Sequence, residues 1–339
     1  MDGNTTDSNY ISSDAPLELR QLPPHRDFNN VPFRYQPPRQ LYCFGDLREM
    51  YGESVNHIRE WLLEHQQHED PIPAQETFLT TVLNQALQFV AEEHGVDVNS
   101  DLHPDIIPAS PETAAGWKPI KTKRLDGSKV YLKKKVINHQ QWFSRTSKHL
   151  NRLGPGRSAA MYNEFKRGLM VDHSQNELEW APSVCEAKRI VSYPVGHLQF
   201  DGYSHVRMEI YEMVHKLPAV KDRVFPVLVI SAEVSPQAFI VVSVPVVEHD
   251  VDFLTANDLF RGKEKYITGT YRSIEYVYLG PEEKGSAVQE GSNDYVHWVM
   301  ATTSCAKGSI KPWMSSMGVP CAIAKDVPNF LRWTRERRP

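Results

Sequence analysis

The chain opens with a segment that lacks regular spacing of apolar residues and continues with two stretches that have helical spacing. Residues 1–40 carry 6 of the 24 prolines and are expected to form a Pro-rich, disordered tail. Apolar residues then recur at intervals of three and four over residues 47–62 and again over residues 78–90. Gly95 stands where a helix C-cap belongs, so we predict two helices within an extension covering residues 41–116.

The middle of the chain is dominated by segments typical of strands. Residues 122–136 predict a hairpin with Asp126 and Gly127 in its turn, while residues 142–150 and 158–170 are expected to form short helices. Several further segments alternate between apolar and polar residues, which predicts antiparallel strands. The expected strands are residues 184–193, 202–214, 223–234, 239–247, 265–279 and 294–303.

The last of the predicted elements is a long helix. Residues from Ile310 to Leu331 return to helical spacing, and Pro320 and Pro328 are expected to kink that helix or restart it. Both faces of the strand predicted over residues 271–279 mix polar and apolar side chains, as suits a curved sheet that lines a cavity. The order of short helices, antiparallel strands and one long helix predicts an α+β protein.

Composition narrows the class of protein. The chain of 339 residues is 40% hydrophobic and 24% charged, and it has no apolar run long enough to span a bilayer. Its first residues are polar and acidic, without a charged-then-apolar leader, so we expect a cytoplasmic location. The four cysteines are far apart in the sequence, which predicts reduced, mostly buried thiols and neither a metal site nor a cofactor.

Charge is distributed unevenly along the chain. Residues 1–117 contain 6 Arg, no Lys and 19 acidic residues, a net charge of −13. Since the whole chain carries −4, residues 118–339 carry +9. The change of sign separates the acidic helical extension, residues 41–116, from a domain predicted over residues 117–339. We expect the acidic helices to dock on the basic domain and to screen it from membranes.

Long segments of that domain match a known family pattern. They are residues 142–149, 162–180, 211–233, 239–246, 268–279 and 296–333. Together they resemble a fungal START-like domain family of unknown function, which belongs to the StAR-related lipid-transfer superfamily. The resemblance implies a helix-grip fold, in which a curved antiparallel β-sheet wraps around a long C-terminal α-helix. Cys305 and Cys321 depart from the family pattern.

The resemblance also implies a hydrophobic pocket between the sheet and the C-terminal helix. A monomeric protein would there bind or transfer a lipid or other hydrophobic small molecule. Such pockets are mainly apolar and contain a few polar groups that orient the ligand. The alternative is that the same side chains simply fill a core. The candidate ligand-binding residues are Met208, Ile210, Arg272, Tyr276, Tyr278, Trp298, Met300, Trp313, Met314, Met317, Ile323, Val327 and Phe330.

Two other functions compete with ligand binding. Related helix-grip domains act as cyclases or aromatases, which implies an enzyme acting on a polyketide or terpenoid in fungal secondary metabolism. The acid–base residues would then be His215, Glu209, Arg207 and Tyr276. The alternative for Arg207 and Glu209 is a solvent-facing ion pair that contributes little to the stability of the protein. The third hypothesis is an interaction module, in which the acidic helices recruit a protein partner.

A cluster of cations marks the start of the domain. Residues 118–135 contain eight basic residues and one acidic residue, but no aromatic platform or recognition helix, so no nucleic-acid partner is expected. Contact with an anionic membrane fits the resemblance, at about 1 kcal/mol per cation near the surface. Ordinary solvation of an exposed hairpin is the alternative. The candidate membrane-contact residues are Lys121, Lys123, Arg124, Lys133, Lys134 and Lys135.

Overall fold

A computed structural model describes nine parts of the chain. They are residues 75–94, 116–137, 140–153, 159–193, 202–217, 220–246, 265–280, 295–305 and 312–338. The predicted tail and the first predicted helix, over residues 47–62, lie outside these ranges. Within them, no helix has the length and apolar character needed to cross a membrane.

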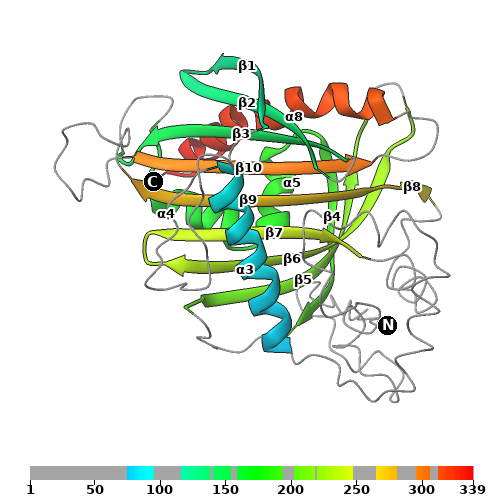
Figure 1. Cartoon of the computed structure of the whole chain (residues 1–339), viewed down its shortest axis with the longest axis horizontal. Coiled ribbons are helices and arrows are strands. Elements are labelled where there is room, and N and C mark those ends of the chain that lie inside the picture. Colours follow the sequence, from blue (N-terminus) through cyan, green and yellow to red (C-terminus); the bar gives the residue numbers. More distant parts are fainter. Residues whose placement is uncertain are drawn as a thin grey trace, which may run out of the picture.

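The described residues form one large, open sheet with helices on both sides (Figure 1). The strands follow the order β1-β2-β3-β10-β9-β7-β6-β5-β4 and pair antiparallel, while short β8 pairs with β6 in parallel. The strands are β1 (Lys118–Leu125), β2 (Ser128–Ile137), β3 (Gln140–Leu150), β4 (Val184–Tyr193), β5 (Ser204–His215), β6 (Arg223–Ser235), β7 (Ala238–Pro245), β8 (Ile267–Thr268), β9 (Thr270–Gly280) and β10 (Tyr295–Cys305). The helical elements are α3 (Gln75–His94), α4 (Tyr162–Phe165), the π-helical turn η3 (Lys166–Met170), α5 (His173–Trp180) and α8 (Pro312–Glu336).

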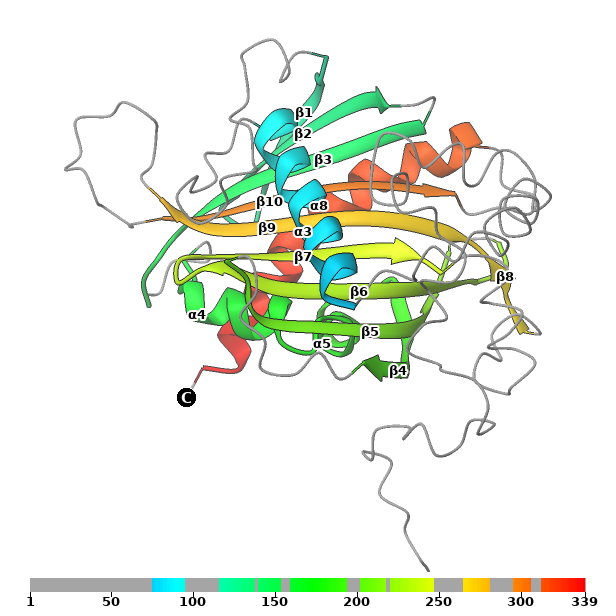
Figure 2. The same cartoon turned by 60° about the horizontal axis from the view of Figure 1, so that its bottom comes forward.

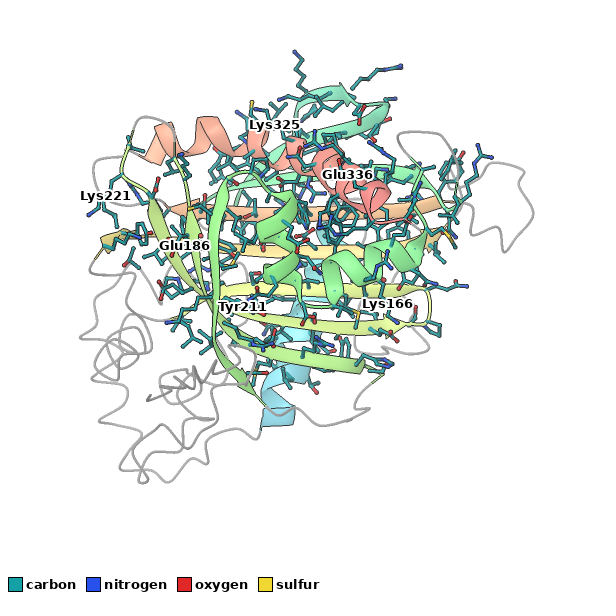
Figure 3. All side chains as sticks on the ribbon, turned by 180° about the vertical axis from the view of Figure 1, so that it is seen from behind. Lys166, Glu186, Tyr211, Lys221, Lys325 and Glu336 are labelled. Atoms are coloured by element: carbon teal, nitrogen blue, oxygen red, sulfur yellow. The ribbon has the colours of Figure 1, made fainter. Side chains whose placement is uncertain are left out.

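The two faces of the sheet carry two separate apolar cores. The outer face is the one that α3 crosses in front of β9, β7, β6 and β5 (Figures 1 and 2). The inner face packs against α4, η3, α5 and α8 (Figure 3). Because side chains alternate along a strand, Ile274 and Tyr276 of β9 join the outer core, whereas Val277 joins the inner core. The sheet wrapped against α8 confirms the predicted helix-grip arrangement.

Helix α3 confirms the second predicted helix, and its apolar stripe packs against the outer face of the sheet. Leu79, Val82, Leu83 and Ala86 are fully buried in the outer core. Each of the Leu and Val side chains contributes roughly 1.5–3 kcal/mol when it leaves water. Thus α3 is part of the core of the sheet domain, and it lies across β7 and β9 rather than on the basic hairpin.

The basic hairpin forms as predicted. Strands β1 and β2 pair from Lys118 to Leu125, and the turn consists of Asp126 with φ 47° and Gly127 with φ 82°. Two successive positive φ values are typical of the type I′ turn, whose twist matches that of the strands. β1 is the edge strand of the sheet.

Residues 142–150 form most of strand β3, so the prediction of a helix there is wrong. β3 pairs with β2 on one side and with β10 on the other. Its alternation puts Trp142 in the outer core and Phe143 in the inner core. Pairing on both sides and burial on both faces outweigh the weak helical spacing of so short a segment.

The helix predicted over residues 158–170 is confirmed in part, since residues 162–170 form α4 and the π-helical turn η3. Gly168 lets this segment approach α8 closely, because a Cβ atom there would lie 2.6 Å from Phe330 Cε2 and 2.7 Å from Trp333 Cζ3. The C-terminal helix is one element of 25 residues that continues through Pro320 and Pro328, so the expected restart does not occur.

The cysteines differ from the prediction. Cys185, Cys305 and Cys321 are free and exposed, so the expectation of mostly buried thiols is wrong for these three. Cys43 lies outside the described residues. Cys321 lies on α8 and accepts a hydrogen bond from Lys123 Nζ at 3.3 Å, which links α8 to β1.

Candidate functional site

An aromatic cluster fixes the helices to the inner face of the sheet. Phe330 of α8 contacts Phe165 of α4 with ring centroids 4.9 Å apart, Trp298 of β10 at 5.2 Å and Trp180 of α5 at 5.8 Å. Phe165 and Trp298 also meet edge to face at 5.5 Å. The structure therefore brings together two of the predicted ligand-binding residues, Trp298 and Phe330, in a packed cluster.

A buried ion pair lies beside these rings. Arg145 of β3 is 1% exposed, and its guanidinium carbon lies 3.6 Å from the centroid of the Trp298 ring. Its Nη2 donates to Glu275 Oε2 at 3.4 Å, and Trp298 Nε1 donates to the same oxygen at 2.7 Å. Burial lowers the pKa of Arg145, while Glu275 opposes that shift.

Three further ionisable side chains surround this pair from the helices. His173 of α5 directs Nε2 toward Glu275 Oε1 at 3.8 Å and toward Glu177 Oε2 at 3.9 Å. Burial raises the pKa of Glu177 to about 8, and Glu275 adds to the rise. Burial likewise raises the pKa of Asp326 on α8 to about 7, although Arg145 opposes that shift. Near neutral pH Glu177 is therefore mostly protonated and Asp326 partly so.

The same region contains further ionisable side chains that are only half-buried. Glu177, Asp326 and Tyr271 each keep part of their surface accessible, and burial raises the pKa of all three. Glu177 also raises the pKa of Tyr271, so these groups lie close together. His215 is half-buried as well and contacts Tyr271 with ring centroids 6.1 Å apart.

Five predicted ligand-binding residues do not lie on the inner face of the sheet. Met208, Ile210, Tyr276 and Tyr278 belong to the outer core under α3, and Arg272, on the same face, donates to Gln140 Oε1 at 3.1 Å. Their predicted position between the sheet and the C-terminal helix is wrong. Both faces of this sheet are covered by helices, so alternation alone did not reveal which set of residues faces α8.

The other predicted ligand-binding residues come from the inner side. Trp298 is buried in the inner core, and Met300 packs against it from a half-buried position. Ile323, Val327 and Phe330 form the buried stripe of α8. Trp313, Met314 and Met317 belong to α8, but their side chains lie outside the described part of the structure.

The four predicted acid–base residues do not form one constellation. Arg207 pairs with Asp172 at 2.9 Å, and both side chains are nearly half exposed. Glu209 accepts from Arg189 at 3.1 Å. His215 ends the same strand about 26 Å from Arg207 at the usual rise per residue. Tyr276 lies on the outer face.

The predicted membrane-contact residues lie on the edge hairpin, together with apolar side chains. Lys121, Arg124, Lys133 and Lys134 are exposed, whereas Lys123 and Lys135 are half-buried. Three large apolar residues of the hairpin are also exposed, Ile120 at 39%, Tyr131 at 37% and Val136 at 63%. The hairpin thus combines cations with exposed apolar surface.

A separate hollow lies on the outside of the helices. It has a volume of about 410 Å³ and runs between the end of α5 and the last turns of α8. Glu179 occupies part of it, because it accepts from Trp333 Nε1 at 2.8 Å and pairs with Arg337. The hollow is open to solvent and is partly filled by this ion pair. Among the described residues, no group of His, Cys, Asp and Glu is arranged to hold a metal ion.

The sequence reasoning missed the polar groups of the inner face. Arg145 was hidden because its strand was predicted to be a helix, in which it would not share a face with Phe143 and Ser147. Asp326 stands between Ile323 and Phe330 at helical spacing, and an acidic residue within an apolar stripe was a detectable signal. Glu177 and Glu275 carry no such signal, since only the folded chain brings them together.

Comparison with other proteins places this architecture in a family. Residues 142–334 match the family described as protein of unknown function, DUF3074. Uncharacterized protein C577.11 of Schizosaccharomyces pombe is 23% identical over 215 residues, which cover 63% of this chain and 76% of that protein.

Solved structures with a similar arrangement include two human proteins. Human StAR-related lipid transfer protein 5 is 12% identical, with a TM-score of 0.45, over 66% of this chain and 88% of that chain. Human STARD10 is 11% identical, with a TM-score of 0.43, over 66% and 77% of the two chains. The family match spans more than half of the sequence, from β3 to the last turn of α8, and the chain therefore belongs to the DUF3074 family.

Proposed function

We propose that this protein binds a hydrophobic, lipid-type ligand in the space between the inner face of the sheet and helices α5 and α8. The observation that carries the proposal is the group of half-buried ionisable side chains beside the apolar inner core, Tyr271, Glu177 and Asp326. Apolar walls are available beside them from Met300 and from the stripe of α8. A mainly apolar space with a few convergent polar groups is typical of small-molecule sites.

The inner-face residues among those predicted from the sequence are the proposed ligand contacts. They are Trp298, Met300, Ile323, Val327 and Phe330. Methionine adapts its shape to flexible chains, which suits Met300 at the border of the space. The ligand would be carried by a protein that approaches anionic membranes through the β1–β2 hairpin, where exposed cations and Tyr131 lie together.

Native mass spectrometry tests the proposal. The full chain, purified from a eukaryotic host, should carry a co-purified lipid-type ligand, and the empty protein should take up lipid from liposomes. Met300→Trp fills part of the space and should reduce uptake, whereas Leu153→Trp, at an exposed position outside the hairpin, should not change the uptake. Protein that is always empty and takes up nothing would overturn the proposal.

An enzymatic role is the second candidate, and one observation favours it. Burial raises the pKa of Glu177 to about 8, so this half-buried side chain can donate a proton to a bound molecule near neutral pH. The reaction class would be the cyclisation of a polyketide or terpenoid. Mass analysis of a bound substrate before and after incubation tests it, and turnover that survives Glu177→Gln would exclude Glu177 as the acid.

A further inference from the structure

A row of cations crosses three neighbouring strands on the outer face of the sheet. Arg124 of β1 lies directly opposite Lys129 of β2. Val130 of β2 pairs with Ser147 of β3, so the same register places Lys129 beside Lys148. Residues that lie opposite each other in antiparallel strands share a face, with Cβ atoms about 4.5–5.5 Å apart. The backbone of the sheet therefore holds three positive charges side by side.

The arrangement of the hairpin exposes this row. Val130 and Leu132 of β2 are buried in the inner core, so alternation directs Lys129 and Tyr131 to the outer side. Helix α3 crosses β9, β7, β6 and β5 on that side, whereas β1, β2 and β3 lie beyond it (Figure 1). All three cations of the row are exposed, so the described structure presents them to solvent.

The strands that carry the row contribute no opposite charge. β1, β2, β3 and the neighbouring β10 contain no Asp or Glu. The acid next to the row in the sequence is Asp126 of the hairpin turn, and it accepts from Arg335 Nη2 of α8 at 3.2 Å. Adjacent like charges repel one another, and a bound anion reduces this repulsion. The row is therefore suited to an anionic partner.

The surroundings of the row favour a membrane surface over a nucleic acid. Lys129 Nζ lies 4.8 Å from the ring centroid of Tyr131, whose apolar ring and hydroxyl suit the headgroup level of a bilayer. Ile120 and Val136 add exposed apolar surface to the same hairpin. Single-stranded nucleic acids stack successive bases on several aromatic rings, and the outer face of the hairpin offers one.

We propose that Arg124, Lys129 and Lys148 bind a lipid headgroup that carries two or more phosphate groups. The inference rests on the proposed function, in which the hairpin approaches anionic membranes, and it names the chemistry of the headgroup. Several phosphates can contact neighbouring side chains of the row at once, and the guanidinium can donate two parallel hydrogen bonds to one of them. A headgroup with one charge satisfies fewer of these cations, so lipids are distinguished even at equal total charge.

Two kinds of vesicle test this inference on the full-length protein. Both consist mainly of phosphatidylcholine, one with a phosphatidylinositol bisphosphate and the other with enough phosphatidylserine to give the same zeta potential. Co-sedimentation at one salt concentration should show binding to the bisphosphate vesicles that is tighter on the order of tenfold. Equal binding to the two vesicles would overturn the headgroup assignment and leave membrane contact intact.

Two double variants connect the preference to the outer face. Arg124→Gln with Lys129→Gln removes two neighbouring charges of the row and should reduce the preference to about twofold or less. Lys121→Gln with Lys134→Gln is the matched control, because it removes two exposed charges from the inner side of the same strands. The control should weaken binding to both vesicles by a similar factor and keep the preference.

The third cation is tested separately, because Lys148 lies on β3 rather than on the hairpin. Lys148→Gln should reduce the preference about three- to fivefold. A folded Arg124→Gln, Lys129→Gln variant with an unchanged preference would overturn the role of the row. If none of these variants folds, the comparison of the two vesicles on the unmodified protein decides.

Two soluble probes separate the lipid from other anions. Inositol trisphosphate has the headgroup chemistry without a membrane, and an oligouridylate has a phosphate backbone. Both should bind at least about tenfold more weakly than the bisphosphate vesicles, since they gain nothing from the apolar side chains of the hairpin. Equally tight binding of the first would overturn the membrane as the source of the phosphates, and equally tight binding of the second would identify a nucleic acid instead.

The outcomes also separate this inference from ligand binding. Failure of the unmodified protein to bind either vesicle would overturn both the headgroup assignment and membrane contact through the hairpin. Native mass spectrometry of the same preparation then shows independently whether a lipid-type ligand is bound in the interior.

Discussion

The guanidinium of Arg145 lies on the indole ring of Trp298, with its carbon atom 3.6 Å from the ring centroid. Both side chains donate to the same carboxylate oxygen of Glu275. The contact joins strands β3, β9 and β10 at the place where α5 and α8 cover the inner face. The contribution of the hydrogen bond to stability can be measured, because a substitution can remove the Trp298 donor and keep an aromatic ring.

Trp298→Phe keeps an aromatic ring but removes the donor to Glu275. We expect a loss of about 1–3 kcal/mol in the free energy of unfolding, since a buried carboxylate loses its shortest hydrogen bond. Trp180→Phe is the matched control, because Trp180 Nε1 is buried without a hydrogen-bond partner in the described structure. Urea unfolding of both variants gives the comparison, and equal losses would contradict the role assigned to the Trp298 donor.

Glu177→Gln is expected to stabilise the protein, and more strongly as the pH rises. Because the pKa of Glu177 is raised from 4.5 to about 8, the folded protein retains a proton that the unfolded chain releases in this interval. Stability is therefore lost as the pH increases through that window. In thermal unfolding, the melting temperature of the variant should exceed that of the unmodified protein by more at about pH 8 than at about pH 5. Each kcal/mol of stabilisation corresponds to about 2–4 °C.

The control for this pH dependence is Glu186→Gln, whose side chain is about half exposed on β4. His215 has the opposite sign, because burial lowers its pKa from 6.5 to about 4 and stability is lost as the pH falls through that interval. His215 is present in both variants and in the unmodified protein, so comparing their stabilities removes its contribution to the pH dependence. A difference between Glu177→Gln and the unmodified protein that stays constant from about pH 5 to about pH 8 would refute the buried-acid assignment.

Gly168→Ala is expected to destabilise the contact between η3 and α8. The added Cβ would meet Phe330 Cε2 at 2.6 Å and Trp333 Cζ3 at 2.7 Å, and such overpacking usually costs about 1–3 kcal/mol. Gly318→Ala provides the opposite case, since no atom lies within 4 Å of its Cβ position on α8. That variant should gain about 0.5–1 kcal/mol from helix propensity, and chemical denaturation measures both.

Neutralising two cations of the hairpin should weaken binding to anionic liposomes. Lys133→Gln with Lys134→Gln removes two exposed charges, which at about 1 kcal/mol each predicts roughly a 10- to 30-fold loss at low salt. Lys216→Gln with Lys221→Gln removes two exposed charges from another part of the sheet and serves as the control. Co-sedimentation over a range of salt concentrations measures the effect. Equal losses in the two double variants would indicate a non-specific charge effect.

The result of deleting N-terminal residues should depend on whether helix α3 is kept. Removal of residues 1–74 keeps α3, and the sheet domain should remain monodisperse. Removal of residues 1–94 exposes the outer core that Leu79, Val82 and Leu83 cover, and aggregation is expected. Size-exclusion chromatography distinguishes the two. A well-behaved protein without residues 1–94 would support the boundary at residue 117 that the charge pattern predicts.

Much of the architecture was accessible from the spacing of residues along the chain. The hairpin turn at Asp126 and Gly127, helix α3 and strands β4 to β10 follow local patterns that the structure confirms. β3 was missed because its short pattern fits both a helix and a strand, and only pairing with β2 and β10 decides between them. Of the kink or restart expected at the prolines of α8, the restart does not occur, since the helix continues through Pro320 and Pro328 and packs on the inner face.

The sequence by itself determined the class of elements, their order and the presence of a long amphipathic helix at the end of the chain, because these depend on local periodicity. Only the tertiary structure decided which face of each strand packs against that helix. It places Tyr276 and Met208 on the opposite face of the sheet from the proposed ligand. Only the fold joined Arg145, Glu275, Glu177 and Asp326, which lie far apart in sequence. Local spacing fixes the side on which a residue lies, but long-range packing decides what that side encloses.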